Sequence, residues 1–203
     1  MSVGKRVEDA IAKMDEGDPE GALFQISSAI DATAKKERNK GGRTSYKDFI
    51  HENLGLITNV AFGGKSILNL HLGYKHPEIE TDDKGLCTVQ DVFYHAVRCC
   101  LYHEATLPDN LRFTDEGQIR LDAGALVLPS ALVYGLISAV VVSPANANER
   151  VSGCSVLNLG KEPMLLNCLW GKRDEFLWLL EMRKQTLAAL NKLPKRTDPV
   201  PQD

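Results

Sequence analysis

A run of 20 residues without a charged side chain, from Ala123 to Val142, constrains the fold of this chain more than any other segment. The run is as long as a membrane span, but Pro129 interrupts it, Asp122 precedes it, and its flanks lack a cluster of Lys or Arg. It therefore predicts a helix that begins near Pro129. Because that helix is apolar on all sides, we expect other elements to bury it.

Amphipathic helices are expected on both sides of this run. Apolar residues recur at helical spacing within 7–14, 23–34, 46–60, 89–100 and 176–187. Asp18 and Pro19 indicate a helix start, with an N-cap side chain before a proline at the first helical position. Thr44 and Ser45 are expected to cap the next helix. The last amphipathic helix is predicted to extend from Arg173 to Leu190.

Two short segments, 111–114 and 118–122, alternate polar and apolar residues around Asp115-Glu116-Gly117. They predict a β-hairpin in which the glycine supplies the turn. Residues 156–159 fit either a short strand or an irregular packed loop. The expected fold is therefore all-α, an up-and-down helical bundle with a small inserted β-hairpin at about residues 111–122. At this length we expect a single domain over residues 1–193 and a flexible, proline-rich tail over 194–203.

The segment from Val89 to His103 carries the chemistry. On its predicted helix, Asp91, His95, Arg98 and Tyr102 are spaced by four, three and four residues, which places them on one polar stripe. His103 follows Arg98 by five residues, at the last turn, and a proline shortly afterwards ends the helix. An arginine and a histidine held together in this way are a minimal set for cutting RNA without a metal.

The same residues also allow a purely structural interpretation. Arg98 could pair with Asp91 or Glu104, and His103 could be a half-buried histidine favoured by the negative end of the helix dipole. In that case, replacing Arg98 or His103 would lower the melting temperature rather than an activity.

A basic segment lies at residues 35–47, where six cations face one acidic residue. It fits a solvated helix end, at which cations are favoured by the dipole, or a loop that contacts phosphate groups. In the second case Lys36, Arg38 and Arg43 are candidate RNA-binding residues. The net charge of −3 and the pI of about 6.0 give no general attraction to nucleic acid, so any RNA contact must be local.

The sequence predicts no metal and no cofactor. The five cysteines have no CxxC spacing, and His71, His76 and Cys87 have no spacing typical of metal ligands. Residues 63–66 resemble the end of a phosphate-binding loop, but Asn59 stands where its first glycine is required. With no signal peptide pattern, an odd number of cysteines indicates a reduced, cytoplasmic protein without a membrane anchor.

Residues 95–104 resemble the Arg-x4-6-His motif helix of the HEPN superfamily, which includes bacterial ribonuclease toxins and RNA-binding proteins. Residues 29–35, around Asp31, are similar to the first conserved helix of such proteins, and the overall resemblance covers about residues 18–190. It implies a helical bundle that forms a homodimer through the motif helix, with a composite cleft between the two copies. The chain departs from the family where Cys99 follows the arginine, a position that is usually polar.

The resemblance implies a metal-independent endoribonuclease. An RNA 2′-hydroxyl would attack the adjacent phosphorus, leaving a 2′,3′-cyclic phosphate. Histidine titrates near neutral pH, which suits His103 as general acid/base, and guanidinium stays charged, which suits Arg98 as phosphate clamp. Asp91, His95 and Tyr102 would support them. RNA is the expected partner, a toxin or antiviral defence role follows by family analogy, and a toxin would have an antitoxin protein as second partner.

Two alternatives remain open from the sequence. One is a non-catalytic HEPN-like module that binds RNA or a protein, which Cys99 and the acidic net charge favour. The other is an unrelated helical protein in which Arg98 and His103 are structural.

Overall fold

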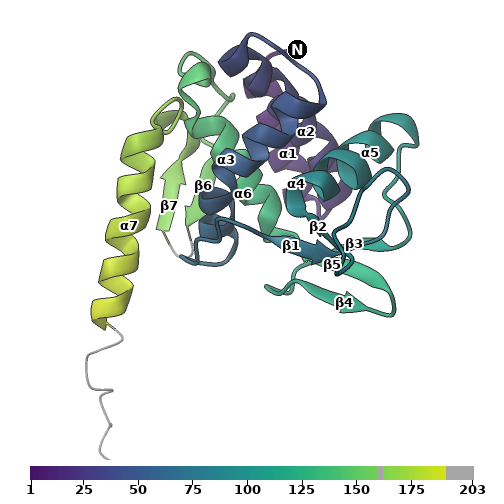
Figure 1. Ribbon diagram of the computed structural model, residues 1–203. Coiled ribbons are helices and arrows are strands. Elements are labelled where there is room, and N and C mark those ends of the chain that lie inside the picture. Colours follow the sequence, from purple (N-terminus) through teal and green to yellow (C-terminus); the bar gives the residue numbers. More distant parts are fainter. Residues whose placement is uncertain (160–161, 191–203) are drawn as a thin grey trace, which may run out of the picture.

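A computed structural model describes residues 1–159 and 162–190 of the chain (Figure 1). The tail predicted at 194–203 lies outside these residues, and the single domain over 1–193 stays a prediction. The helical elements are α1 (Val3–Asp15), α2 (Pro19–Arg38), α3 (Arg43–Ala61), α4 (Val89–Asp91), the π-helix η1 (Val92–Cys99), α5 (Cys100–His103), α6 (Ala131–Val142), the 3-10 turns η2 (Pro144–Asn146) and η3 (Leu166–Cys168), and α7 (Arg173–Leu190).

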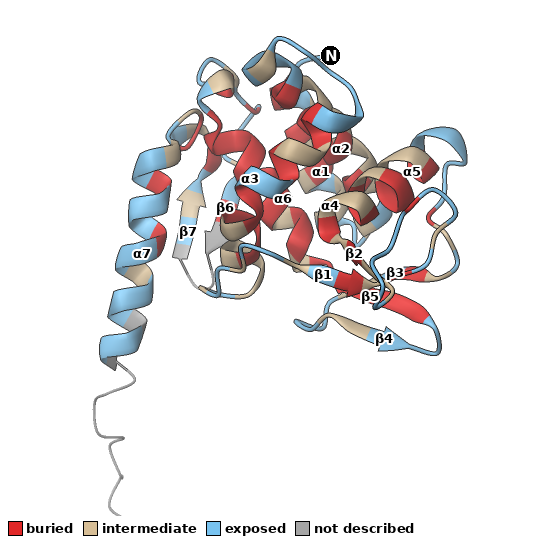
Figure 2. Ribbon diagram, in the orientation of Figure 1, coloured by how far each residue is buried: buried red, intermediate tan, exposed pale blue. Residues whose placement is uncertain are grey.

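The helix predicted near Pro129 is confirmed as α6, and it is the centre of the core. Ten of its 12 residues are buried, and Figure 2 shows this helix almost entirely in the buried colour. Helix α3 packs closely against it at Gly135, where an added Cβ would lie 2.3 Å from the carbonyl oxygen of Ile57. Among the described residues, no helix combines the length and apolar character needed to cross a membrane.

Helix caps were predicted at the starts of α2 and α3, and the structure confirms one of the two. The Asp18 cap is confirmed, because its carboxylate accepts a 2.8 Å hydrogen bond from the Gly21 amide. The cap predicted at Thr44-Ser45 is wrong, since α3 begins at Arg43 with Gly42 as its N-cap. The Ser45 hydroxyl instead donates to the Lys40 carbonyl oxygen at 2.7 Å, which ties the preceding loop to the helix.

The all-α fold class is wrong, because the chain folds as a mixture of helix and sheet, with 55% of residues in helices and 13% in strands. The described residues form three small sheets. Their strands are β1 (His71–Gly73), β2 (Leu86–Thr88), β3 (Leu111–Thr114), β4 (Arg120–Asp122), β5 (Ala125–Pro129), β6 (Val156–Leu159) and β7 (Glu162–Leu165). β1 pairs antiparallel with β2, β6 pairs antiparallel with β7, and the largest sheet has the order β3-β5-β4. Residues 156–159 are therefore a strand.

The hairpin predicted at 111–122 is also wrong, because β3 and β4 do not pair with each other. Strand β5 lies between them, parallel to β3 and antiparallel to β4. The tight turn is at Ala123-Gly124, whose φ angles of 48° and 85° suit a two-residue hairpin. All five residues of β5 are buried, so this central strand reads in the sequence as part of the apolar run rather than as an alternating strand.

The helix predicted from Val89 to His103 is confirmed in its limits but not in its geometry. Its central eight residues, η1, form a π-helix, whose i→i+5 hydrogen bonds place more residues in each turn than an α-helix does. The 3.6-residue spacing that predicted one polar stripe therefore does not apply. His95 is buried with the core, whereas Arg98 is half-buried.

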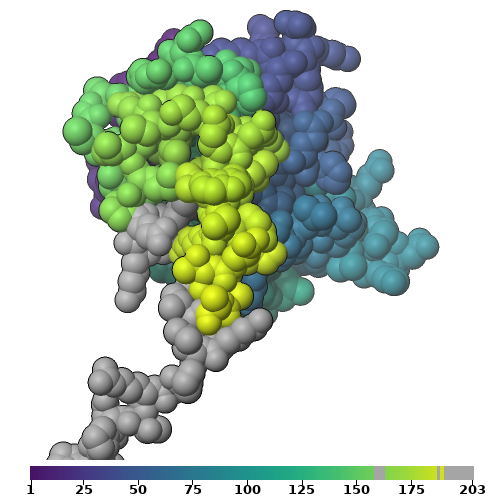
Figure 3. Space-filling model, turned by 90° about the vertical axis from the view of Figure 1, so that its left-hand side faces the viewer, coloured from purple at the N-terminus to yellow at the C-terminus, as the bar shows by residue number. Residues whose placement is uncertain are grey.

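Helix α7 confirms the last predicted helix and runs along the face of the molecule shown in Figure 3. It packs against the rest of the chain through Phe176 and Leu180, which are buried. The intervening Leu177, Trp178 and Leu179 are exposed, with Trp178 at 61%. This helix is therefore attached by a narrow apolar stripe.

Candidate active site

A pocket of about 430 Å³ lies where the first residue of α3, the loop after β1 and the segment from η1 to α5 meet. It brings together three of the chain's five histidines. The lining residues are Arg43, His76, Glu78, Tyr94, His95, Cys99, Cys100, His103 and Glu104. The concentration of imidazoles and the single guanidinium make it the strongest candidate for a site of acid–base chemistry.

His103, the predicted general acid/base, lines this pocket from the last residue of α5. Its side chain is exposed, and the helix ends directly after it with a 2.7 Å hydrogen bond from the Glu104 amide to the Cys100 carbonyl oxygen. Ala105, with a φ of 59°, then turns the chain away. His103 is therefore held at the pocket by a helix end but remains open to a ligand.

His95, a predicted supporting residue, is the buried histidine of the pocket. It is only 5% exposed, and its Nε2 atom has no hydrogen-bond partner among the described residues. Burial lowers the pKa of His95 below its ordinary value, and the nearby Arg43 lowers it further. The pKa shift means that the ring binds a proton less readily here than in water.

His76 is the third histidine of the pocket, and no sequence pattern predicts it as a site residue. It lies in the loop after β1, where its Nδ1 accepts a hydrogen bond of 3.2 Å from the Glu78 amide. Its Nε2 lies 3.7 Å from the Cys100 Sγ, and its ring centroid lies 6.4 Å from that of His95. No periodicity or spacing in the sequence links this loop histidine to the motif helix, so only the fold could show the contact.

Arg98, the predicted phosphate clamp, is not among the residues that line the pocket. Its Nε donates to Asp31 Oδ2 on α2 at 3.1 Å, and its Nη2 lies 3.1 Å from the same oxygen. The guanidinium also lies over the rings of Tyr94 and Tyr102, 5.4 and 5.0 Å from their centroids. Its Nη1 faces the pocket-lining Cys99, 3.9 Å from the Sγ.

Arg98 was expected to pair with Asp91 or Glu104, and both expectations are wrong because its partner is Asp31. Asp91 pairs instead with Lys47 and accepts from the Thr88 hydroxyl. Burial raises the pKa of Asp91, but Lys47 and Thr88 more than offset this, so the pKa lies below its ordinary value. Asp31 lies on α2, 67 residues before Arg98 in the chain, so the fold and not local spacing brings the two side chains together.

Tyr102, the third supporting candidate, packs away from the pocket. Its ring lies 5.0 Å from that of Phe24, and its hydroxyl hydrogen-bonds with Ser28, both on α2. It therefore helps to attach the motif helix to α2 and covers one side of Arg98.

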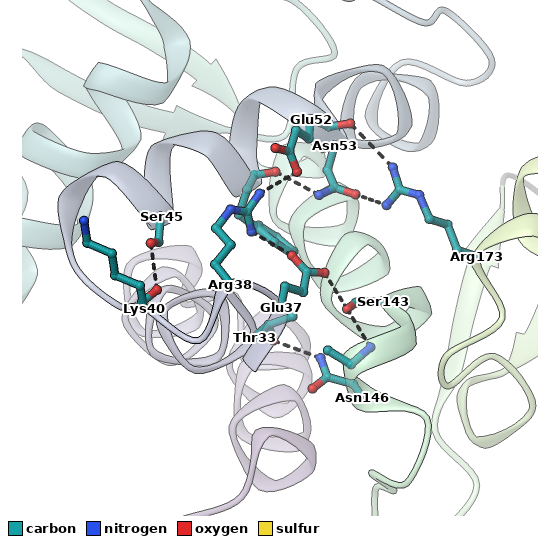
Figure 4. A network of polar contacts seen from close by, with 12 residues as sticks. Thr33, Glu37, Arg38, Lys40, Ser45, Glu52, Asn53, Ser143, Asn146 and Arg173 are labelled. Carbon is teal, nitrogen blue, oxygen red and sulfur yellow. Dashed lines mark hydrogen bonds and ion pairs between the residues drawn. The ribbon is translucent and has the colours of Figure 1, made fainter. Parts of the chain in front are cut away.

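Of the three predicted RNA-binding residues, the structure brings only Arg43 to the pocket. Lys36 pairs with Glu149 at 2.8 Å. Arg38 pairs with Glu37 at 2.9 Å and with Glu52 at 2.5 Å. Figure 4 shows Arg38 in a polar network that joins α2, α3 and the residues after α6. These ion pairs occupy both cations and give them a structural role.

The Figure 4 network also involves buried amides. The Asn146 side chain donates to Thr33 and to the Val140 carbonyl oxygen, each at 2.8 Å, and Arg173 donates to the Asn53 side chain. Because each buried polar group has a partner, this network is typical of structural polar contacts in a core. In the part of the chain that the structure describes, no group of three or more His, Cys, Asp or Glu is arranged to hold a metal ion.

Comparison with known proteins identifies one family. A family model described as Rv1289 matches residues 2–193. No curated protein and no solved structure matches the chain.

Proposed function

The chain belongs to the Rv1289 family, and from the geometry of its pocket we propose that it is a metal-independent endoribonuclease. The observation that carries the proposal is the gathering of His76, His95 and His103 around one pocket with Arg43. Imidazole is the side chain best suited to move protons near neutral pH, and guanidinium is suited to bind phosphate oxygens. Several imidazoles in one pocket supply separate groups for the two proton transfers of RNA cleavage.

The reaction would proceed by attack of a ribose 2′-oxygen on the adjacent phosphorus. As the new P–O bond forms, one imidazole takes the proton of the 2′-hydroxyl. The bond to the 5′-oxygen breaks, and a protonated imidazole gives that oxygen a proton. The products are a 2′,3′-cyclic phosphate and a free 5′-hydroxyl. We assign His103 to one of these transfers because it is the exposed histidine of the pocket.

Arg98 would position the motif helix at the edge of the pocket. Asp31 holds its Nε and Nη2, and Nη1 faces Cys99 on the pocket wall. The resemblance of residues 95–104 to the HEPN motif helix supports the same proposal. On that resemblance we also propose a cytoplasmic protein that forms a homodimer through the motif helix and acts on RNA as a toxin or defence factor. A toxin would have an antitoxin protein as its second partner.

One observation favours a second candidate function, a non-catalytic module that binds RNA or a protein. The guanidinium of Arg98 is paired with Asp31 and covered by two tyrosine rings, as expected for an arginine that joins two helices. In this case the pocket would bind its partner without cleaving it.

The two functions are distinguished by incubating RNA with the purified protein in EDTA and analysing the product ends. We expect the wild type and His51→Ala to leave 2′,3′-cyclic phosphate ends, and His103→Ala to leave the RNA intact. His51 is a matched control, because it is an exposed histidine outside the pocket. RNA that stays intact with every folded protein but is bound by the wild type would identify the binding module. Equal cleavage by folded His103→Ala would exclude the assigned role of His103.

A further inference from the structure

The two permanent cations that act on His95 are not equivalent. Arg43 lines the same pocket, whereas Lys47 acts on the ring together with the anion Asp91. Lys47 is neutralised by its ion pair with Asp91. Arg43 forms no ion pair within the described residues, although the exposed Glu78 and Glu104 line the same pocket. The pocket therefore contains one guanidinium that makes no ion pair with a carboxylate of the described chain.

The Nε2 atom of His95 is a second unsatisfied group in the same pocket. A buried polar atom without a hydrogen-bond partner is rare, because its loss of water is not compensated. His95 is buried, lines the pocket, and has this unpartnered atom. No group of the described residues supplies the missing partner, so a ligand bound against His95 would have to supply it.

His76 adds a donor of known orientation. Its Nδ1 accepts from the Glu78 amide, so in the neutral ring the proton is on Nε2. That nitrogen lies 3.7 Å from the Cys100 Sγ, another lining residue of the pocket. The ring is also stacked on Tyr74, with 19° between the two planes, which fixes its direction. A ligand would therefore meet an N–H at this wall without a change of tautomer.

We infer that Arg43, His76 and His95 form a binding subsite for one phosphate group of RNA, beside His103. The Arg43 guanidinium donates only, the Nε2–H of His76 is a second donor, and a phosphate offers several acceptor oxygens. Glu78 and Glu104 line the same pocket, but both are exposed to solvent. The inference rests on the proposed function only for the choice of RNA as the source of the phosphate. In this subsite Arg43, on α3, supplies the positive charge that faces the phosphate. Arg98 then serves only to position the motif helix.

Binding without cleavage tests the subsite separately from the nuclease. The protein is titrated in a calorimeter with inorganic phosphate and with a short RNA whose 2′-hydroxyls are all methylated. The methylated RNA keeps its phosphate groups but lacks the nucleophile for cleavage. We expect both ligands to bind the wild type, and Arg43→Ala to weaken binding about tenfold or more. The matched control is Arg112→Ala, which removes an exposed arginine on β3 outside the pocket and should bind like the wild type.

The Nε2 atom provides a second readout. In the wild type, phosphate should shift the ¹⁵N resonance of His95 Nε2, and this shift should disappear in Arg43→Ala. A wild type that binds neither ligand, or an Arg43→Ala protein that binds both unchanged, would overturn the subsite. Binding of inorganic phosphate but not of the RNA would overturn RNA as the source. Lost binding in Arg43→Ala together with no RNA cleavage by the wild type would support the subsite and reject the nuclease.

Discussion

Arg98 on the π-helix and Asp31 on α2 are joined by a hydrogen bond and an ion pair, with Nε and Nη2 each 3.1 Å from one carboxylate oxygen. Both side chains are about three-quarters buried. The contact links α2 to the π-helix, and it gives Arg98 a structural role in addition to any contact with a substrate. The predictions below separate that role from the chemistry of the pocket.

The ion pair should contribute measurably to stability. We expect Asp31→Ala and Arg98→Ala each to lower the free energy of unfolding by about 1–2 kcal/mol, between the values typical of exposed and buried pairs. Because both variants break the same contact, the double variant should cost less than the sum of the two. Urea unfolding of all four proteins measures this coupling. A coupling of zero would show that the contact does not stabilise the protein.

His103 should matter for cleavage but not for stability. Its side chain is exposed, so His103→Ala should change the free energy of unfolding by less than about 0.5 kcal/mol. Loss of a general acid or base should slow RNA cleavage by about 10²–10⁴-fold. The check is a comparison of cleavage rates and urea unfolding with those of the wild type. A large loss of stability would instead support the structural interpretation of this histidine.

Stability should depend on pH through His95. Burial and the nearby Arg43 lower the pKa of His95 in the folded chain, so the unfolded chain binds a proton first as the pH falls. The contribution of neutral His95 to the free energy of unfolding is fully present above about pH 6.5. It is lost as the pH drops through the lower pKa of the folded chain, and the free energy of unfolding then falls by at most about 1.4 kcal/mol per pH unit. Melting temperatures between pH 7.5 and 5 should therefore fall more steeply for the wild type than for His95→Gln. Parallel curves would contradict the pKa shift.

The close contact between α3 and α6 should not tolerate a methyl group. In Gly135→Ala the new Cβ would meet the Ile57 carbonyl oxygen at 2.3 Å, so the two helices must move apart. We expect a loss of about 1–3 kcal/mol in the free energy of unfolding. The control is Gly117→Ala, where an added Cβ meets nothing within 4 Å. Unfolding of the two variants side by side tests the contact, and similar stabilities would show that α3 and α6 can separate without cost.

Some elements could be predicted because their signals are local. The side chain of Asp18 caps the helix that Pro19 begins, and the uncharged run before Val142 predicts a buried helix. Amphipathic spacing likewise predicts the helical segment that ends at His103 and the final helix, α7. Each of these features depends on residues within one or two turns of one another, so it can be recognised without knowing the rest of the fold.

The sheet and the π-helix could not be predicted in this way. Strand β5 separates β3 from β4 because its buried residues pair with both. The alternation of polar and apolar residues along a single strand does not indicate which other strand it pairs with. The π-helical hydrogen bonds move His95 into the core, although α-helical spacing predicts it on the same polar stripe as Arg98.

The sequence and the tertiary structure each determined a part of the candidate site. The sequence by itself determined that an arginine and a histidine lie five residues apart on one helix, because the backbone imposes that relation. Only the tertiary structure decided that Arg98 pairs with Asp31, and that His76 and Arg43 join His95 and His103 around one pocket. The physical reason is that these partners come from α2, α3 and the loop after β1, and only the packing of those elements brings their side chains within contact distance.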